Sequence, residues 1–407
     1  MKKIIGPFCE LLPMSGLPMK GSIKDENLPV VKEGAILVEE GKISAVGSFQ
    51  ALLKLHPNIT VEEISGDFVG LPGLIDCHTH ICFGGSRAKD YAARNNGKSY
   101  QDIAAAGGGI WDTVTKTRTT SQDELGASTE LRLDQLLQRG ITTVEVKSGY
   151  GLTVSEELKM LRAINTLSSS HRMDIVATCL AAHIIPREFS DEEAYLSYIL
   201  QELVPQVRGE QLSNRFDIFI EENAFTPSKS IPYLNALKAS GFDITVHGDQ
   251  FTTGGSATAI QVGARSVDHL EASGDSEIKA LSKSSVVPVV LPGASIGLGI
   301  SFAPARALLD AGCSLAIASD WNPGSAPQGN LLMQAALLGA YEKLSAAEVF
   351  SGITFRAAAA LGLSAVGSIV EGLQADFIGF SCDDYREILY QQGALQPSIV
   401  WKKGIRI

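Results

Sequence analysis

The sequence predicts an α/β protein: a TIM-type (β/α)8 barrel with a small β-sandwich built from the N- and C-terminal segments. Short apolar runs rich in β-branched residues alternate with helical segments through the middle of the chain. Both ends of the chain are rich in short strands instead. The 407 residues exceed the roughly 250 that eight βα units need, which leaves room for an accessory domain.

The strand patterns at the two ends predict the accessory domain. Residues 35–39 and 42–46 flank Glu40-Gly41, a pattern that predicts a β-hairpin. Three more short strands are expected at the far end: 367–370, 375–378 and 398–401. Because these ends share a structural class, we expect them to pair. The predicted domains are a small β-sandwich, residues 1–66 with 366–407, and a barrel, residues 67–365.

The barrel prediction depends on eight candidate strands. They end at His80, Lys147, His183, Glu222, His247, His269, Leu291 and Asp320. The strand at 141–146 is representative, and the segment after it, 155–161, has the apolar spacing of a helix. Eight such units in series favour a closed parallel barrel over an open sheet.

A long segment separates the first strand from its helix. It runs from Cys82 to Ser121 and contains Arg87, Arg94 and a glycine triplet at 107–109. A loop of this length in a compact domain is usually functional. The triplet lacks the Lys-Ser/Thr of a phosphate-binding loop and does not directly follow a strand, so it favours the hinge of a moving lid.

The composition of the chain limits the kinds of molecule that the protein is expected to bind. A net charge of −11, with no run of Lys or Arg, argues against nucleic acid and for a small-molecule substrate. The most apolar run, 286–300, is broken by Pro288 and Pro292, so we expect no membrane span. The N-terminus lacks a signal peptide's apolar core, and the six cysteines show no paired pattern. We therefore expect a cytoplasmic protein, and a homodimer is the prior expectation.

The histidines carry the strongest chemical signal. Residues two apart on a strand point to the same face, so His78 and His80 can reach one metal ion. Five of the seven histidines fall at predicted strand ends, and barrel active sites lie on the face where strands end. They are His78, His80, His183, His247 and His269.

Asp320, at the end of the eighth strand, completes a ligand set beside the first strand. With His78, His80 and His247 it can hold one divalent ion and leave a position for water. Such an ion lowers the pKa of bound water toward about 7. Asp320 can take the proton of that water, and His269 can steady the water or polarise the carbonyl under attack.

Longer motifs around these residues carry a family resemblance. The chain resembles the amidohydrolase superfamily at Pro72-Gly73-Leu74-Ile75-Asp76-Cys77-His78-Thr79-His80, at His247 and His269, and at Ala318-Ser319-Asp320. Over nearly its full length it is similar, more narrowly, to the imidazolonepropionase family of histidine breakdown. The narrower similarity rests on Phe83-Gly84-Gly85-Ser86-Arg87, Gly107-Gly108-Gly109-Ile110, Glu145-Val146-Lys147-Ser148-Gly149-Tyr150-Gly151 and Asp320-Trp321-Asn322-Pro323-Gly324-Ser325.

The resemblance implies an activity and a set of roles. It implies hydrolytic ring opening of 4-imidazolone-5-propanoate to N-formimidoyl-L-glutamate, with one zinc or iron ion bound by His78, His80, His247 and Asp320. Arg87, Tyr150 and His183 would grip the substrate, with Arg87 at the propanoate. Asn322, Gly324 and Ser325 would line the ring and the nascent formimidoyl group.

Two departures from related enzymes shape the alternatives. Related deaminases carry Glu three residues after the fifth-strand His, where this chain has Gln250. Gln250, expected among the catalytic residues, cannot transfer a proton, which disfavours the alternative of an aminohydrolase acting on a heterocyclic amine. It also leaves His269, Asp320 or a water to protonate the leaving ring nitrogen. The fourth strand lacks the Lys of two-metal relatives, which favours one metal, and the complete ligand set argues against a non-catalytic scaffold.

Overall fold

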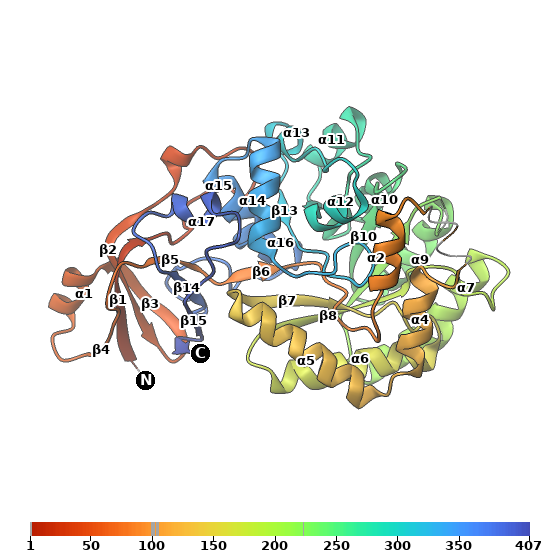
Figure 1. Cartoon of the computed structure of the whole chain (residues 1–407), viewed down its shortest axis with the longest axis horizontal. Coiled ribbons are helices and arrows are strands. Elements are labelled where there is room, and N and C mark those ends of the chain that lie inside the picture. The colour runs from red at the N-terminus through yellow and green to blue at the C-terminus, as the bar shows by residue number, and fades with distance from the viewer. Residues whose placement is uncertain (1, 99–101, 103–105, 223) are drawn as a thin grey trace.

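The computed structural model describes residues 2–98, 102, 106–222 and 224–407, and it confirms the predicted fold class (Figure 1). Eight parallel strands lie side by side in chain order, each paired with the next. They are β6 (Leu74–Asp76), β7 (Ile141–Lys147), β8 (Asp174–Ala182), β9 (Arg215–Ile220), β10 (Asp243–Gly248), β11 (Ser266–His269), β12 (Val287–Val290) and β13 (Ala316–Ile317). All eight predicted strands are present.

The barrel closes between β6 and β13 through the residues that follow each strand. Thr79 and Trp321 form an isolated parallel bridge. On either side of it, the His80 amide donates to the Trp321 carbonyl at 2.9 Å, and the Asp320 amide donates to the His78 carbonyl at 3.1 Å. The metal ligands predicted on these two strands therefore lie on the backbone that completes the barrel.

Both closing strands end earlier than predicted. Next to these backbone hydrogen bonds, the Asp76 carboxylate accepts from the Ser319 amide at 2.9 Å and from the Ser319 hydroxyl at 2.5 Å. His78 and His80 therefore stand on the extension of β6, and Asp320 on the extension of β13.

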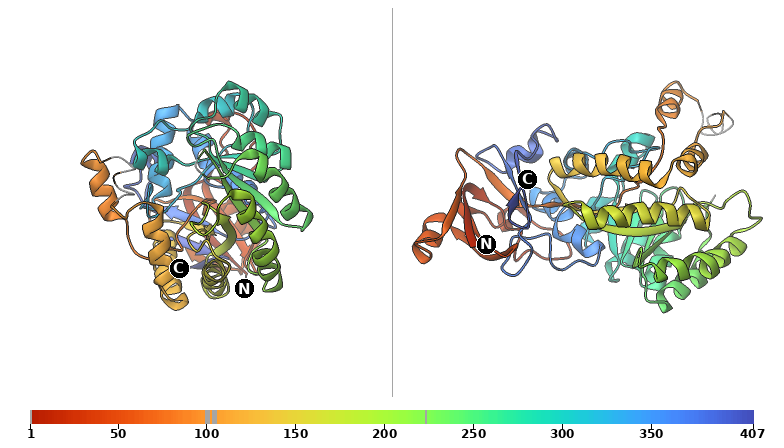
Figure 2. Two further views of the ribbon diagram at one scale, coloured as in Figure 1. Left: turned by 90° about the vertical axis from the view of Figure 1, so that its right-hand side faces the viewer. Right: turned by 90° about the horizontal axis from the view of Figure 1, so that it is seen from below.

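Helices cover the outside of the barrel (Figures 1 and 2). Ser121 and Glu124 form a capping box at the start of the long helix after the first strand, and its buried face includes Leu125 and Leu133. The helices are α5 (Gln122–Gln138), α6 (Val154–Ser170), α7 (Glu192–Tyr198), a π-helix (Ile199–Leu203), α8 (Val204–Gly209), α9 (Pro227–Ala239), α10 (Gly255–Val262), α11 (Asp275–Ser282), α12 (Pro292–Leu298), α13 (Ala305–Asp310), α14 (Leu331–Glu342), α15 (Ala346–Gly352) and α16 (Phe355–Ala360).

The predicted insert at 82–121 contains helical structure of its own. Helix α2 (Ala88–Asn95) projects from the body of the barrel, and α4 (Ile110–Thr119) precedes α5 (Figure 2). Gly107 and Gly109, of the glycine triplet, have left-handed φ values of 85° and 79°, and Gly109 is the N-cap of α4. The triplet therefore forms the turn into that helix. Residues 99–101 and 103–105 of the insert lie outside the described residues, and its motion as a lid stays a prediction.

A separate sheet combines both ends of the chain, as predicted. Its order is β16-β15-β14-β5-β1-β2-β3, with β4 also paired to β1. The strands are β1 (Lys2–Leu11), β2 (Val31–Glu39), β3 (Lys42–Ser48), β4 (Thr60–Glu63), β5 (Val69–Pro72), β14 (Phe377–Phe380), β15 (Ile399–Lys402) and β16 (Ile405–Arg406). The predicted hairpin corresponds to the antiparallel pair β2–β3.

One predicted terminal strand, 367–370, is wrong. Gly367 has a left-handed φ of 95°, and a Cβ there would lie 2.8 Å from the Phe355 Cα. The chain bends at this close approach, and Ile369 makes a single backbone hydrogen bond to the Pro13 carbonyl, 2.8 Å, in place of a strand ladder. The predicted bounds of the two domains stay a prediction. Strand β5 pairs within the terminal sheet, although it follows the predicted boundary at residue 66.

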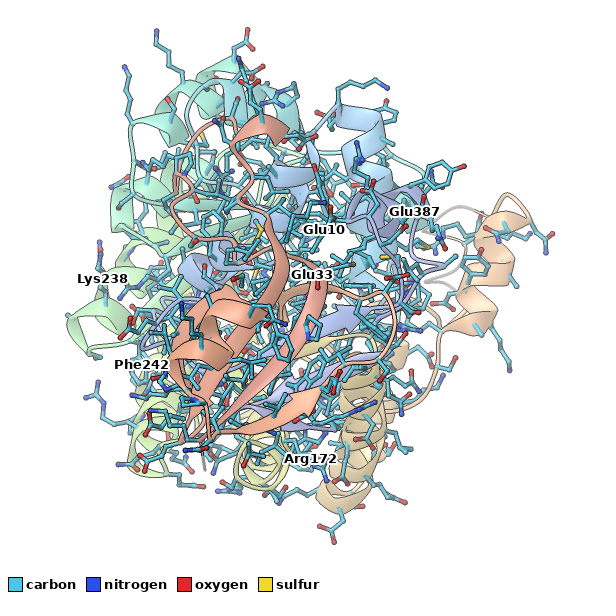
Figure 3. All side chains as sticks on the ribbon, turned by 90° about the vertical axis from the view of Figure 1, so that its left-hand side faces the viewer. Glu10, Glu33, Arg172, Lys238, Phe242 and Glu387 are labelled. Carbon is cyan, nitrogen blue, oxygen red and sulfur yellow. The ribbon has the colours of Figure 1, made fainter. Side chains whose placement is uncertain are left out.

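Aromatic packing and an ion-pair network hold the terminal sheet in place. Phe8, Phe377 and Trp401 are buried together, with the Phe377 and Trp401 rings stacked at 4.8 Å. Lys402, on β15, contacts Asp174 of barrel strand β8 at 2.7 Å. Figure 3 views the molecule from this end, with the terminal sheet in front of the barrel. The terminal sheet thus lies away from the ends of the strands that carry the histidines.

Candidate active site

Four of the predicted site residues converge at the barrel mouth. The Nε2 atoms of His78 and His80 are 3.2 Å apart, and His247 Nε2 is also 3.2 Å from His80 Nε2. Asp320 Oδ1 lies 3.6 Å from His78 Nε2 and 3.4 Å from His80 Nε2. All four side chains are buried. The strands predicted from spacing alone therefore bring the four predicted ligands together.

Buried carboxylates orient two of these imidazoles. Asp268 Oδ2 lies 2.6 Å from His78 Nδ1, and Asp217 Oδ2 lies 2.8 Å from His247 Nδ1. Asp268 accepts a hydrogen bond from His78 Nδ1–H, and Asp217 lies close enough to favour the proton on His247 Nδ1, so Nε2 is the unprotonated atom in both rings. Both Nε2 lone pairs then face the centre of the cluster.

The fully buried Lys147 links the two carboxylates from below. Its Nζ is 2.8 Å from Asp217 and 4.0 Å from Asp268, and it also contacts Glu145 at 2.7 Å. Burial alone would lower the pKa of Lys147, but the three carboxylates outweigh it and raise that pKa. Lys147 is therefore a permanent cation beneath the cluster, with Arg215 3.5 Å from Glu145 as a second one.

The protonation states of the cluster suit a metal cation. Burial lowers the pKa of both His78 and His80 well below 6.5, and it lowers that of His247 to about 3, so all three rings are neutral at pH 7. Burial raises the pKa of Asp320 to about 6. Neutral imidazole and carboxylate are the ligands that zinc and iron accept. Because lone pairs 3.2 Å apart repel unless a cation lies between them, the donor set fits a bound metal ion.

His269 stands at the edge of the same cluster. Its ligand atoms group with those of His78 and His247 within 4.8 Å, and its Nδ1 is 3.5 Å from Glu271 Oε2. Burial would lower the pKa of His269, but Glu271 outweighs that effect and raises it. Glu271 in turn accepts from the Ser295 hydroxyl at 3.0 Å. His269 thus differs from the other three imidazoles in having a carboxylate that favours its protonated form.

The backbone at the barrel mouth is turned into unusual conformations. Asp249, His269 and Asp320 have left-handed φ values of 57°, 93° and 49°. Such conformations cost free energy and gather at functional sites. The buried Gln250 follows Asp249, three residues after His247.

Tyr150 and His183 lie together on one side of the cluster. Their rings are 5.4 Å apart, and the His183 ring stacks on His80 at 5.5 Å. His183 Nδ1 donates to the Gly149 carbonyl at 3.0 Å, and burial lowers the pKa of His183 to about 4. Burial also raises the pKa of Tyr150. The pair therefore offers a neutral imidazole and a protonated phenol.

Arg87 meets the loop that follows Asp320. A Cβ added at Gly324 would lie 2.4 Å from Arg87 Nη1, so the glycine makes room for the guanidinium. Asn322 stabilises this loop, because its Oδ1 accepts from the amides of Gly324 and Ser325 at 2.7 and 2.8 Å. Its Nδ2 donates to the Ser325 hydroxyl at 2.9 Å. The polar atoms of Asn322 are therefore engaged within the loop.

A pocket of about 340 Å³ opens where Arg87 meets this loop. Within the described residues, its walls are formed by Phe83, Gly85, Ser86, Arg87, Ala88, Tyr91, Arg132, Trp321, Pro323 and Pro327. Because Trp321 directly follows Asp320, the pocket borders the histidine cluster without containing it. Arg87 thus lines a pocket that opens to the surface.

Sequence reasoning missed the residues that surround the ligands. Asp217 and Asp268 contact His247 and His78, Glu271 contacts His269, and Glu157 holds the loop that carries Tyr150. Asp217 and Asp268 stand on the predicted strands that carry the site, so an acidic residue inside a strand signal was the available clue. Glu157 and Glu271 gave no such signal, because each lies outside a strand.

Comparisons with known proteins identify the family. Residues 104–404 match the model of the amidohydrolase family. An imidazolonepropionase from Bdellovibrio bacteriovorus is 39% identical over 404 residues, which cover 98% of this chain and 94% of the relative. An imidazolonepropionase from Rubrobacter xylanophilus is 39% identical over 396 residues, which cover 96% and 95%.

Solved structures share the fold at lower identity. A zinc-bound adenosine deaminase from Xanthomonas campestris has a TM-score of 0.71 at 19% identity, covering 99% of this chain and 92% of that one. A triazine hydrolase variant has a TM-score of 0.76 at 17% identity, covering 100% and 94%. None of the helices in the described part of the chain has both the length and the apolar character to cross a bilayer.

Sequence similarity over nearly the whole chain, together with the barrel and the buried histidine cluster, leads to one conclusion. The chain belongs to the imidazolonepropionases of the amidohydrolase family.

Proposed function

We propose that this chain is a metal-dependent hydrolase that opens the ring of 4-imidazolone-5-propanoate to give N-formimidoyl-L-glutamate. The observation that carries the proposal is the convergence of His78, His80, His247 and Asp320 within a few ångströms, beside an accessible Arg87. Relatives at 39% identity over nearly the full chain are imidazolonepropionases by name, which supports the choice of substrate.

His78, His80, His247 and Asp320 would hold one zinc or iron ion. When bound, the ion supplies Lewis-acid chemistry, which lowers the pKa of water and polarises a carbonyl. Asp217 and Asp268 keep His247 and His78 aligned for this role. These N and O ligands suit both metals, so metal analysis of the purified protein is the measurement that distinguishes zinc from iron.

Arg87, Tyr150 and His183 would fix the substrate. A guanidinium offers a planar, bidentate match to the propanoate carboxylate. The protonated hydroxyl of Tyr150 can donate a hydrogen bond, and the neutral His183 can accept one at Nε2 because its Nδ1 is engaged with Gly149. These contacts would hold the ring carbonyl at the cluster.

Asp320 would move the proton during ring opening. Water adds its oxygen to the ring carbonyl carbon, the C–N bond breaks, and one water proton must reach the departing nitrogen. Asp320, whose Oδ1 lies 3.4 Å from His80 Nε2 within the cluster, would accept this proton and return it to the departing nitrogen. Gln250 cannot carry this proton, and His269 would donate a hydrogen bond to the carbonyl oxygen that gains charge.

The first test follows the absorbance of 4-imidazolone-5-propanoate with purified wild-type protein and the variant His78→Ala/His80→Ala. We expect substrate loss with the wild type alone, formation of formimidoylglutamate, and no ammonia. Release of ammonia from a heterocyclic amine instead would favour an aminohydrolase. A metal-loaded wild type without turnover would exclude the proposed substrate.

We also propose a cytoplasmic homodimer, as the sequence suggests. The dimer is supported by the prevalence of twofold oligomers among soluble enzymes. Light scattering of the purified protein tests the dimer, and cell fractionation tests the location. A monomer at micromolar concentration would contradict the proposed dimer.

A further inference from the structure

A buried glutamate outside the proposed catalytic set holds the loop that follows β7. Glu157, on α6, has no exposed surface. Its Oε1 accepts from the amides of Gly151 and Leu152, both at 2.7 Å, and its Oε2 accepts from the amide of Gly149 at 3.0 Å. One carboxylate therefore satisfies backbone donors on both sides of Tyr150.

The loop needs these contacts because its backbone leaves regular structure. Gly149 and Leu152 have left-handed φ values of 114° and 60°, so their amides cannot join a strand ladder. The loop also lies in tight contact, since a Cβ at Gly149 would be 2.9 Å from the Leu180 carbonyl oxygen. An unmet buried amide is costly, and a charged acceptor makes the strongest replacement.

Both proposed substrate contacts on this side depend on the loop. Tyr150 lies between the amides of Gly149 and Gly151 that Glu157 holds. The Gly149 carbonyl accepts from His183 Nδ1, and that bond sets which nitrogen of His183 faces the site. A shift of the loop would therefore move the phenol and turn the imidazole together.

We propose that Glu157 is a positioning residue for substrate binding, acting through Tyr150 and His183; this inference rests on the proposed function. The carbonyls of the loop have other anchors. Arg118 Nε donates to the Gly151 carbonyl at 2.7 Å, and the Tyr195 hydroxyl donates to the Leu152 carbonyl at 3.1 Å. Glu157 supplies the acceptor for the three amides, which sets the orientation of the peptides next to Tyr150.

The matched test compares Glu157→Gln with Glu156→Gln. The preceding residue on the same helix, Glu156, pairs with Lys159 and is partly exposed. Gln at 157 turns one acceptor oxygen into an NH2 group that faces an amide donor. Because small displacements of orienting groups cost about 100-fold, we expect kcat/KM to fall about 100-fold in Glu157→Gln at unchanged metal content. Glu156→Gln should stay within about twofold of wild type.

A double-mutant cycle separates positioning from general destabilisation. If Glu157 acts through His183 and Tyr150, adding Glu157→Gln to His183→Asn should reduce kcat/KM by much less than it does in wild type. Equal reductions in both backgrounds would overturn the proposal. So would a Glu157→Gln enzyme as active as Glu156→Gln.

Two further controls keep the outcomes distinct. Should Glu157→Gln fail to fold, Glu157→Asp takes its place in the same cycle, because it keeps the charge but withdraws the carboxylate by one methylene. Equal reductions of kcat/KM in the wild-type and His183→Asn backgrounds would again overturn the proposal, and a much smaller reduction in His183→Asn would support it. A wild type that does not turn over the imidazolone would refute the proposed function instead, before either variant is compared.

Discussion

Lys147→Met is predicted to separate the stability of the barrel from its affinity for metal. The side chain has no exposure, and Nζ lies 2.7 Å from Glu145 and 2.8 Å from Asp217. Removing one partner of a buried ion pair costs about 3–5 kcal/mol, because the remaining charge loses its compensation. Met fills most of the space, so we expect the loss to come from charge rather than from a cavity.

The same substitution should weaken metal binding. Asp217 and Asp268 orient His247 and His78, and without Lys147 these carboxylates repel each other and shift against the imidazoles. Loss of such supporting contacts lowers metal affinity about 10–100-fold. Urea unfolding of metal-free protein measures the first effect, and Zn²⁺ competition with a chelator measures the second.

Lys402→Met provides the matched control. Lys402 is also buried and pairs with Asp174 and Asp376 at 2.7 and 2.6 Å, but at the contact with the terminal sheet. We expect it to cost similar stability while leaving Zn²⁺ affinity unchanged. Equal losses of Zn²⁺ affinity in both variants, or none in Lys147→Met, would refute the reasoning.

Three further predictions test the site. The pKa of His183 is about 4 in the folded protein, mainly through burial, and 6.5 for a free histidine; the unfolded chain therefore binds the extra proton between these values. The free energy of unfolding of metal-free protein should fall by up to about 1.4 kcal/mol per pH unit as the pH drops from 6.5 to about 4. In urea titrations of His183→Asn, this part of the pH dependence should be absent. Gly324→Ala places a Cβ 2.4 Å from Arg87 Nη1, so the KM for the imidazolone should rise about tenfold while Zn²⁺ content stays unchanged. Zn²⁺ at 1,000 times its dissociation constant should stabilise the protein by about 4 kcal/mol in calorimetry, and His78→Ala/His80→Ala should show no such gain.

The sequence predicted the barrel and the convergence of its histidines because strand alternation is a local property. His78 and His80, two apart, pointed to one metal without knowledge of the fold, and the helical spacing between strands predicted the parallel order. Each of these signals lies within a few residues of the chain.

The supporting carboxylates were harder to predict because alternation fails where the strand ends. Adjacent residues on a strand point to opposite faces, which would send either Asp268 or His269 away from the barrel axis. His269 has a φ of 93°, and the turned backbone lets both side chains reach the site. The contact of Asp217 with His247 depends on the pairing of β9 with β10, and the sequence of neither strand alone predicts that pairing.

The site and the closure of the barrel share the same residues. The backbones of His78, His80 and Asp320 make or flank the hydrogen bonds that join β6 to β13, while their side chains converge on one another. A substitution at one of these residues therefore leaves the closing hydrogen bonds in place and removes a proposed metal donor. A change at Asp76, which accepts from Ser319 across the same seam, would instead loosen closure and disturb all three ligands at once. Metal affinity should accordingly respond to residues that never contact the metal.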